Sequence, residues 1–185
     1  GAEGGRDIDA LVSNMDVFPT VCELLGVPTP EDVHGVSMVP LLDGSAPSVR
    51  DDLFSEINFH GAAEPTRCVR TKDWNLIVRF DDDPRKPLAN VDGSPTRDRW
   101  LEAGYGSIPR KDVRLIDLQN DPPEQGDVAK DPAYASVRMA LEDRLARWME
   151  RTDVPLLKGP LKVPPGAKIA TREAVDAAGP FEPAG

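Results

Sequence analysis

The sequence predicts an α+β fold in which a long C-terminal helix packs on a small antiparallel sheet. Strand-like runs rich in apolar, β-branched and aromatic residues occur at 52–57, 67–71, 74–80 and 113–118. Only Lys72 and Asp73 separate the second run from the third, a spacing that favours an antiparallel hairpin. The helix is expected after Asp131 and Pro132, because Asp is a favoured N-cap and Pro is favoured at the first helical position.

The expected C-terminal helix has one apolar face. Its apolar residues follow one another at spacings of three and four: Tyr134, Val137, Leu141, Leu145 and Trp148. Because the chain offers no other long amphipathic helix, this face is expected to cover the strands at 67–71 and 74–80. Leu141, Leu145 and Trp148 would make that contact.

A short helix is expected near the N-terminus, after a strand candidate at residues 8–12. Asp16 is the expected N-cap, Pro19 fits the first turn, and Gly26 ends the helix. The helix would carry an apolar stripe that needs a neighbouring element to cover it, formed by Val17, Phe18, Val21, Leu24 and Leu25. Residues 27–50 are predicted to be a loop.

Two further stretches are predicted to lie outside the core. Residues 81–105 are polar and rich in Asp, Pro and Gly, so we expect an excursion from the sheet. Beyond Leu157 the chain alternates Pro, Gly, Lys and Ala without periodicity, which predicts an extended or disordered tail. The chain begins with Gly1 and has no signal-peptide pattern, so we expect the natural start to lie elsewhere.

The charge balance limits the classes of partner. With 32 acidic against 22 basic residues and a net charge of -10, the chain is not expected to bind nucleic acid or an anionic membrane. A polyanionic partner would need a local basic pocket. No apolar run approaches the roughly 20 residues that a membrane-spanning helix needs, so no membrane span is expected.

Several catalytic signatures are absent from the sequence. There is no GxSxG elbow, and only two histidines could serve as bases. Cys22 and Cys68 lie far apart and form no CxxC or zinc-type spacing, so free thiols are expected. The acidic segments at 81–83 and 117–122 fit solvated loops better than cation sites. A self-contained Ser or Cys hydrolase is therefore not expected.

One cluster of charged residues has the character of a binding site. Glu56, His60, Glu64, Arg67 and Arg70 lie in or beside the loop predicted between two strands, a usual position for functional groups. The planar fork of an arginine binds sulfate or carboxylate oxygens through two hydrogen bonds. Alternatively, Arg67 pairs with Glu56 or Glu64 to hold the loop, and His60 caps a backbone group. Strand alternation favours a structural role for Arg70.

Several consecutive motifs resemble the sulfatase family. Three motifs resemble the passage between the sulfatase catalytic domain and its C-terminal subdomain: NMDVFPTVCELLGV (14–27), HGVS (34–37) and PLLDG (40–44). Three further motifs resemble the N-sulfoglucosamine sulfohydrolase (heparan N-sulfatase-like) branch: FSEINFH (54–60), EPTRCVRT (64–71) and LANVDGSP (88–95). Two later segments, residues 115–122 and 129–132, resemble the strand and turn that precede the last helix in this family. Together the resemblance covers residues 8–166, which makes chance convergence a poor explanation.

This resemblance implies an alkaline-phosphatase-like α/β catalytic domain followed by a small C-terminal subdomain with an antiparallel sheet and a helix. Residues 1–50 would be the end of the catalytic domain and a linker, residues 51–157 the sheet and helix subdomain, and residues 158–185 the tail. The chain would be the C-terminal fragment of a sulfatase that hydrolyses sulfate esters or N-sulfo groups. Its partners would be a sulfated glycan, or another sulfated small molecule, and the N-terminal catalytic domain of the same protein.

The resemblance also implies where catalysis takes place. In the family, a Cys within a C-x-P/A-x-R motif becomes formylglycine, and a calcium ion held mainly by Asp and Asn offsets the sulfate charge. Cys22 precedes Glu-Leu-Leu-Gly and Cys68 precedes Val-Arg-Thr-Lys, so neither fits the motif. Calcium and formylglycine are thus expected in the parent enzyme and not on this chain, which by itself is expected to be inactive.

The substrate pocket is the part of the site that this chain is expected to share. The resemblance implies that His60 and Arg67 donate to sulfate or sugar oxygens and that Glu64 accepts from a hydroxyl or amine. The sequence departs from the branch at two places: Thr66 stands where the branch often has Met, and residues 73–75 replace a more basic aromatic segment. The family is often exported, which points to a periplasmic or extracellular location.

Two other functions fit parts of the sequence. A carbohydrate-binding module would need an exposed aromatic platform, for which Trp74, Trp100 and Tyr105 are available. A fragment of a phosphonate or phosphate monoester hydrolase of the same superfamily would also need an anion clamp. A C-x-P/A-x-R motif in the reading frame upstream of Gly1 would favour the sulfatase, and its absence would favour the module.

Overall fold

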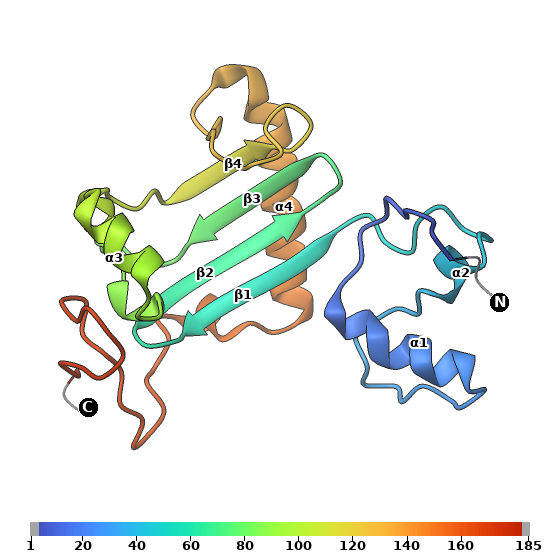
Figure 1. Cartoon of the computed structure of the whole chain (residues 1–185), viewed down its shortest axis with the longest axis horizontal. Coiled ribbons are helices and arrows are strands. Elements are labelled where there is room, and N and C mark those ends of the chain that lie inside the picture. The colour runs from blue at the N-terminus through green and yellow to red at the C-terminus, as the bar shows by residue number, and fades with distance from the viewer. Residues whose placement is uncertain (1–3, 183–185) are drawn as a thin grey trace.

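A four-stranded antiparallel sheet with the strand order β1-β2-β3-β4 forms the centre of the protein (Figure 1). The computed structural model describes residues 4–182, so residues 1–3 of the first predicted unit and 183–185 of the predicted tail lie outside the described residues. The strands are β1 (Leu53–Phe59), β2 (Ala63–Arg70), β3 (Trp74–Arg79) and β4 (Val113–Asp117). All four predicted strands are confirmed, and β2 and β3 form the expected hairpin.

Strand β2 begins at Ala63, inside the segment where the sequence predicts a loop. The register of the β1–β2 pairing shifts between Ile57 and Phe59, opposite Glu64 and Pro65. Pro lacks an N–H and cannot donate a ladder hydrogen bond. Where the register is irregular, no such bond is required from it. The predicted loop is therefore wrong for Glu64, which lies on a strand.

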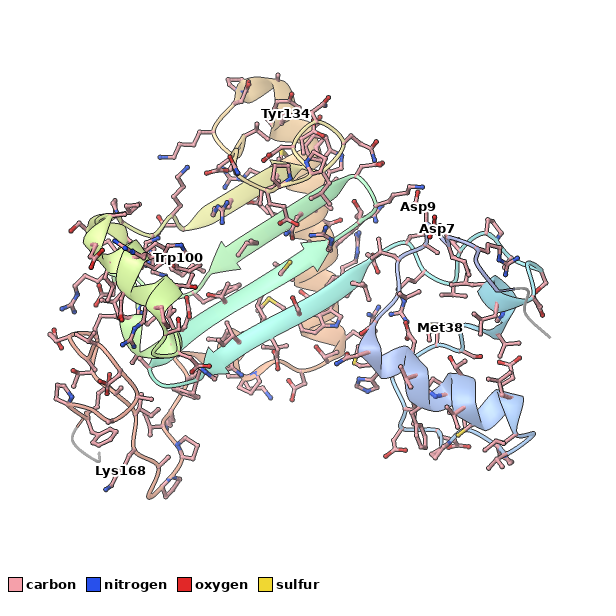
Figure 2. All side chains as sticks on the ribbon, viewed as in Figure 1. Asp7, Asp9, Met38, Trp100, Tyr134 and Lys168 are labelled. Atoms are coloured by element: carbon pink, nitrogen blue, oxygen red, sulfur yellow. The ribbon has the colours of Figure 1, made fainter. Side chains whose placement is uncertain are left out.

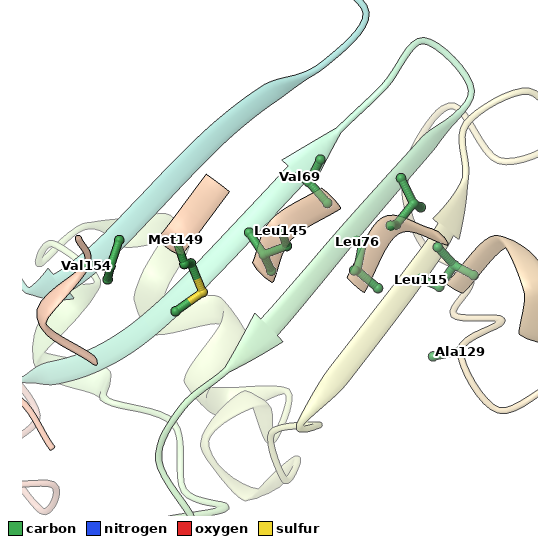
Figure 3. Packing of buried hydrophobic residues seen from close by; sticks show 8 residues of the cluster. Val69, Leu76, Leu115, Ala129, Leu145, Met149 and Val154 are labelled. Atoms are coloured by element: carbon green, nitrogen blue, oxygen red, sulfur yellow. The ribbon is translucent and has the colours of Figure 1, made fainter. Parts of the chain in front are cut away.

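Helix α4 (Ala135–Arg151) crosses behind the sheet in Figure 1 and covers one of its faces. The buried core between helix and sheet appears in Figure 3 and consists of Val69, Leu76, Leu115, Ala129, Leu141, Leu145, Met149 and Val154. Apolar area removed from water at this interface is the main stabilising term of the fold. The predicted α+β fold, an antiparallel sheet packed by a C-terminal helix, is confirmed.

The helix meets the centre of the sheet through Leu141, Leu145 and Met149, which follow one another every fourth residue and are buried. Trp148 instead stacks on Phe54 of β1, with ring centroids 5.0 Å apart and an interplanar angle of 2°. The expected packing is confirmed for Leu141 and Leu145 and wrong for Trp148. Successive helical residues are rotated by about 100°, so the indole beside Met149 is directed to the β1 edge of the sheet.

The start of the C-terminal helix is as predicted. A 3-10 turn, η4 (Pro132–Tyr134), precedes α4, and Asp131 Oδ1 accepts a hydrogen bond from Ala133 N at 2.9 Å. The carboxylate thereby satisfies one of the free N–H groups of the first turn, and Pro132 has no N–H to satisfy.

The N-terminal segment forms η1 (Asn14–Asp16), α1 (Val17–Leu24) and α2 (Val39–Leu42), which lie beyond one end of the sheet in Figure 1. Helix α1 confirms the predicted short helix. Residues 8–12 form no strand, so that prediction is wrong. Within residues 4–182 no strand pairs with this stretch, and an extended segment without a pairing partner has no ladder to join.

Asp16 has a different task from the one predicted. Its carboxylate makes no capping bond to α1. It is fully buried and accepts hydrogen bonds from Ser13 N at 2.7 Å, from Val36 N at 2.8 Å and from the Arg50 guanidinium. Asp16 therefore ties η1 to the loop that follows α1 and to the chain entering the sheet.

The apolar stripe of α1 faces solvent. The side chains that the sequence assigns to a buried face are 47–72% exposed: Val17, Phe18, Val21, Leu24 and Leu25. The buried residues of the helix are Pro19, Thr20 and Cys22, on its other side. No part of residues 4–182 covers the stripe, so the neighbouring element that was expected to cover it is not among the described residues.

The polar excursion and the tail surround one end of the sheet. The excursion contains η2 (Leu88–Asn90), α3 (Pro95–Glu102) and η3 (Tyr105–Ser107), and α3 contributes no buried residue. After η5 (Pro155–Lys158) the tail is extended and pairs at single bridges, Ala62 with Ala170 and Ala170 with Phe181. None of the described helices is both long and apolar enough to cross a membrane.

The helix-sheet interface yields a direct test. Leu145 is 3% exposed at the centre of the core, so Leu145→Ala should lower the free energy of unfolding by about 2–5 kcal/mol, through lost burial and a residual cavity. Leu157→Ala is the matched control, because Leu157 is 51% exposed and should cost well under about 1 kcal/mol. Urea unfolding of both variants measures the difference, and equal losses would contradict the interface.

Candidate functional site

The turn between β1 and β2 carries His60, which is exposed. Its backbone N–H donates to Ala62 O at 3.2 Å, and Asn90 Oδ1 accepts from Ala62 N at 2.6 Å. A side chain at Gly61 would place its Cβ 2.4 Å from Ala89 O, so only glycine permits this approach of η2. The turn is therefore held firmly while the imidazole of His60 stays accessible.

Glu64 and Arg67 point to opposite faces of β2, because an odd spacing of three residues reverses the direction of a strand side chain. Glu64 lies on the open face. There its Oε2 accepts from Asn90 Nδ2 at 2.8 Å and its Oε1 lies 3.2 Å from Arg110 Nη2. Arg67 lies on the α4 side, so the structure does not bring the three predicted site residues together.

The Arg67 guanidinium is enclosed, with 0% of the residue exposed. Its Nη1 donates to Ile57 O at 3.1 Å and its Nη2 to Asn58 Oδ1 at 2.7 Å, while Nε lies 3.1 Å from Glu56 Oε2. Burial lowers the pKa of Arg67, and the charge of Glu56 opposes that effect. Arg67 thereby joins β2 to the irregular end of β1. This arrangement agrees with the alternative from the sequence in which Arg67 pairs with Glu56 to hold the loop.

A cleft of about 500 Å³ lies on the open face of the sheet, between β2, β3, β4 and the polar excursion. Glu64 and Thr66 line it from β2, and Tyr105 lines it from η3. Five basic side chains also line it, Arg79, Lys86, Arg110, Lys111 and Arg114, against the acidic Glu64 and Asp127. This is a local basic pocket on a chain whose net charge is -10.

Asp81 organises one wall of this cleft. Its carboxylate lies 3.0 Å from Arg110, 3.3 Å from Arg79 and 3.5 Å from Arg172. One acidic group thus joins β3, the excursion and the tail. The sequence treats Asp81 as part of a solvated acidic loop, and the three arginines that meet it are too far apart in the chain to be grouped by motif.

Lys86 lies over the ring of Tyr105, with its Nζ 3.9 Å from the ring centroid. Burial lowers the pKa of Lys86, and the nearby charges of Arg114 and Arg110 lower it further. Sequence reasoning misses Lys86, Arg110 and Arg114 as site residues. The only signal in the sequence is that basic residues border a polar excursion, which is common on protein surfaces.

Glu124, in the loop after β4, holds the other end of the open face. Its Oε1 accepts from Arg70 Nη1 at 2.5 Å and its Oε2 accepts from Asn75 Nδ2 at 2.8 Å. The hydrogen bond from Arg70, followed by that from Asn75, lowers the pKa of Glu124 against the opposing effect of burial. The structural role predicted for Arg70 agrees with this contact between β2, β3 and the loop.

The cysteines and acidic residues do not fit the cofactors expected of the parent enzyme. Cys22 is buried in α1, and Cys68 Sγ donates to Asn75 Oδ1 at 2.8 Å within the sheet. Burial raises the pKa of the Cys68 thiol, which is the opposite of activation. Among residues 4–182 no three His, Cys, Asp or Glu side chains cluster in a way that could hold a metal ion.

The sequence matches a family model described as N-sulphoglucosamine sulphohydrolase, C-terminal, over residues 1–98. The chain belongs to this family. This sulfatase C-terminal region is 30% identical to an ulvan-active sulfatase of Formosa agariphila over 151 residues, which is 79% of this chain and 30% of that protein. It is 26% identical to the human N-sulphoglucosamine sulphohydrolase over 180 residues, which is 84% of this chain and 36% of that enzyme.

Solved structures show the same fold as this sulfatase region. A 2-O GAG sulfatase superposes with a TM-score of 0.56 at 22% identity, covering 80% of this chain and 26% of that one. A protein solved in complex with its substrate D-glucosamine-2-N,6-O-disulfate superposes with a TM-score of 0.53 at 19% identity, covering 78% and 24%. The chain thus spans about a third or less of the structures and roughly a third of the sequence relatives.

A mutation of Arg67 distinguishes a structural role of this residue from direct contact with the substrate. Arg67→Ala should lower the free energy of unfolding by at least about 2 kcal/mol, because it leaves buried acceptors of β1 without their donor. The matched control is Arg147→Ala, which removes an exposed i,i+4 pair with Asp143 and should cost about 0.5 kcal/mol or less. Urea unfolding measures both. Unchanged stability together with weaker binding of a sulfated disaccharide would support the direct substrate contact predicted from the resemblance.

The clamp around Glu124 predicts a pH dependence of stability. Since its folded-state pKa is lowered, its stabilising contribution is present above its ordinary pKa of 4.5 and is lost as the pH falls through the lower folded-state value. Glu124→Gln should therefore destabilise the protein at neutral pH, with a difference from the unmodified chain that narrows in acid. Thermal unfolding from neutral to acidic pH tests this, with the exposed Glu150→Gln as control. A constant difference would contradict it.

Proposed function

We propose that this chain is the C-terminal part of a sulfatase that hydrolyses sulfate esters or N-sulfo groups on sulfated glycans or on another sulfated small molecule. The observation that carries the proposal is the family match over residues 1–98. The relatives support it, because an ulvan-active sulfatase and an N-sulphoglucosamine sulphohydrolase both align with most of this chain. The basic cleft supplies a place for an anionic ligand on an otherwise acidic protein.

In this proposal the chain supplies structure and one side of the substrate pocket. His60 is exposed on a rigid turn, where its imidazole can donate to a sulfate or sugar oxygen. Glu64 lines the cleft and can accept from a hydroxyl or amine while Asn90 and Arg110 hold it in place. Arg67 would act beneath them as a positioning residue, since it joins the strands that carry the turn.

The catalytic groups would come from an N-terminal catalytic domain of the same protein. The family resemblance assigns the nucleophile to a formylglycine and the charge compensation to calcium, both in that domain. Two observations agree with such a partner: the chain spans 30% of the ulvan-active sulfatase, and α1 leaves a stripe of apolar side chains uncovered. That domain would cover Phe18, Leu24 and their neighbours on α1.

A carbohydrate-binding module is the second candidate, and one observation favours it. Trp100 is 49% exposed and lies against Tyr105 at the cleft, with ring centroids 5.5 Å apart. Such a surface could stack on a sugar ring without any catalysis. The two functions differ in what precedes the chain, because only a sulfatase needs an upstream C-x-P/A-x-R motif.

An activity assay tests the proposed division of labour. The purified chain should show no turnover of an aryl sulfate or of N-sulfoglucosamine, with or without calcium. A longer form that includes the upstream domain should hydrolyse one of these substrates. Reproducible turnover by the chain alone, abolished by a substitution within it, would contradict the proposal. Failure of the longer form, together with retained binding of a sulfated disaccharide, would favour the module.

A further inference from the structure

Two of the five basic side chains that line the cleft on the open face lack a carboxylate partner among residues 4–182. Arg110 is compensated by Glu64 and Asp81, and Lys111 by Asp127 at 2.7 Å. Lys86 and Arg114 form no ion pair with a carboxylate among the described residues 4–182. The Arg114 Nη2 donates to a backbone acceptor, Glu124 O, at 3.3 Å, and the charge of Arg114 lowers the pKa of the Glu124 carboxyl. Among the described residues, Lys86 and Arg114 are therefore the two basic side chains of the cleft that have no carboxylate in an ion pair.

Lys86, Arg110 and Arg114 line the same cleft. Burial and the nearby charges of Arg114 and Arg110 lower the pKa of Lys86, and the charge of Glu64 opposes them, so all of these groups act on one space. Like charges held close together in a partly enclosed space repel one another and are costly unless an anion lies between them. Tyr105 orients the Lys86 ammonium from below through its ring face and leaves the charge available.

We propose that this cleft is an anion subsite in which Lys86, Arg110 and Arg114 bind a sulfate or carboxylate group of an acidic saccharide. Arginine forks bind such oxyanions through paired hydrogen bonds, and a lysine adds a compact point charge. Side chains of Thr66 and Gln125 line the same space and offer neutral hydrogen-bonding groups. Its three basic groups lie outside residues 60–67, in the excursion, before β4 and on β4, whereas Thr66 lies within that stretch, on β2.

Size and charge limit the ligand. A volume of about 500 Å³ exceeds what one sulfate needs and falls within the range of pockets for small organic ligands. The net charge of -10 repels a long polyanion outside the cleft. A single anionic group on a short saccharide fits both limits, with the sugar ring toward the aromatic pair of Trp100 and Tyr105. This choice of a saccharide rests on the proposed function, whereas the anion site itself does not.

Calorimetric titration of the 185-residue chain tests the subsite. Four probes are compared: inorganic sulfate, a sulfated disaccharide, an unsulfated disaccharide with a uronic acid, and a neutral disaccharide. We expect saturable binding of at least one acidic disaccharide and none of the neutral one. Preference for the sulfated probe identifies a sulfate ligand, and preference for the uronic acid identifies a carboxylate. No binding of either acidic probe, or equal binding of the neutral one, would overturn the proposal.

Matched variants separate the cleft from general electrostatics. Lys86→Gln and Arg114→Gln should each weaken binding of the preferred probe at least about tenfold, near 1.4 kcal/mol. Arg99→Gln removes the same charge from the exposed side of α3, where Arg99 pairs with Glu102, and should leave affinity unchanged. Equal losses in all three variants would overturn the site.

Thermal unfolding checks that each variant is folded. If Arg114→Gln proves unstable, Lys86→Gln decides the outcome, because Lys86 lies in the excursion and outside the strands. Binding is measured on the chain alone, whereas the proposed function is tested by hydrolysis with the upstream domain. A failure of one therefore leaves the other result standing.

Discussion

A sheet that has one helix to cover it must divide its side chains into a dry face and a wet face. Strand β2 makes this division residue by residue, with Arg67 and Val69 toward α4 and Glu64 and Thr66 toward the open cleft. A shift of one residue in its register would exchange the two sets. The core, the positions of the predicted site residues and the existence of the cleft all depend on this alternation.

Charge organises the open face in the way that apolar contact organises the other. Asp81 contacts arginines from β3, from the segment just before β4 and from the tail, and Glu124 joins β2 to β3. These acidic groups are shared among several partners and fix the walls of the cleft, and within residues 4–182 neither of them forms an ion pair with Lys86 or Arg114. Figure 2 shows Trp100 on α3 and Lys168 in the adjoining tail.

The N-terminal segment follows a different principle. Asp16 holds it together through buried hydrogen bonds, whereas the apolar side of α1 stays uncovered. A sulfatase catalytic domain on that side would remove the stripe from water, and the α4 core would remain independent of it. The chain therefore combines a subdomain with its own core and a helix whose apolar face lacks a partner among the described residues.

Local pattern and chain order determine much of this protein: runs rich in apolar, β-branched and aromatic residues predict the strands, a two-residue spacing predicts the β2–β3 hairpin, and spacings of three and four predict the face of α4. The family motifs follow from the same linear order. Only tertiary structure decides that Trp148 stacks on β1, that Arg67 is enclosed, and that Lys86, Arg110 and Arg114 line one cleft. The physical reason is distance: hydrogen bonds and charges act over a few ångströms in space, and residues far apart in sequence come that close only after the sheet has formed.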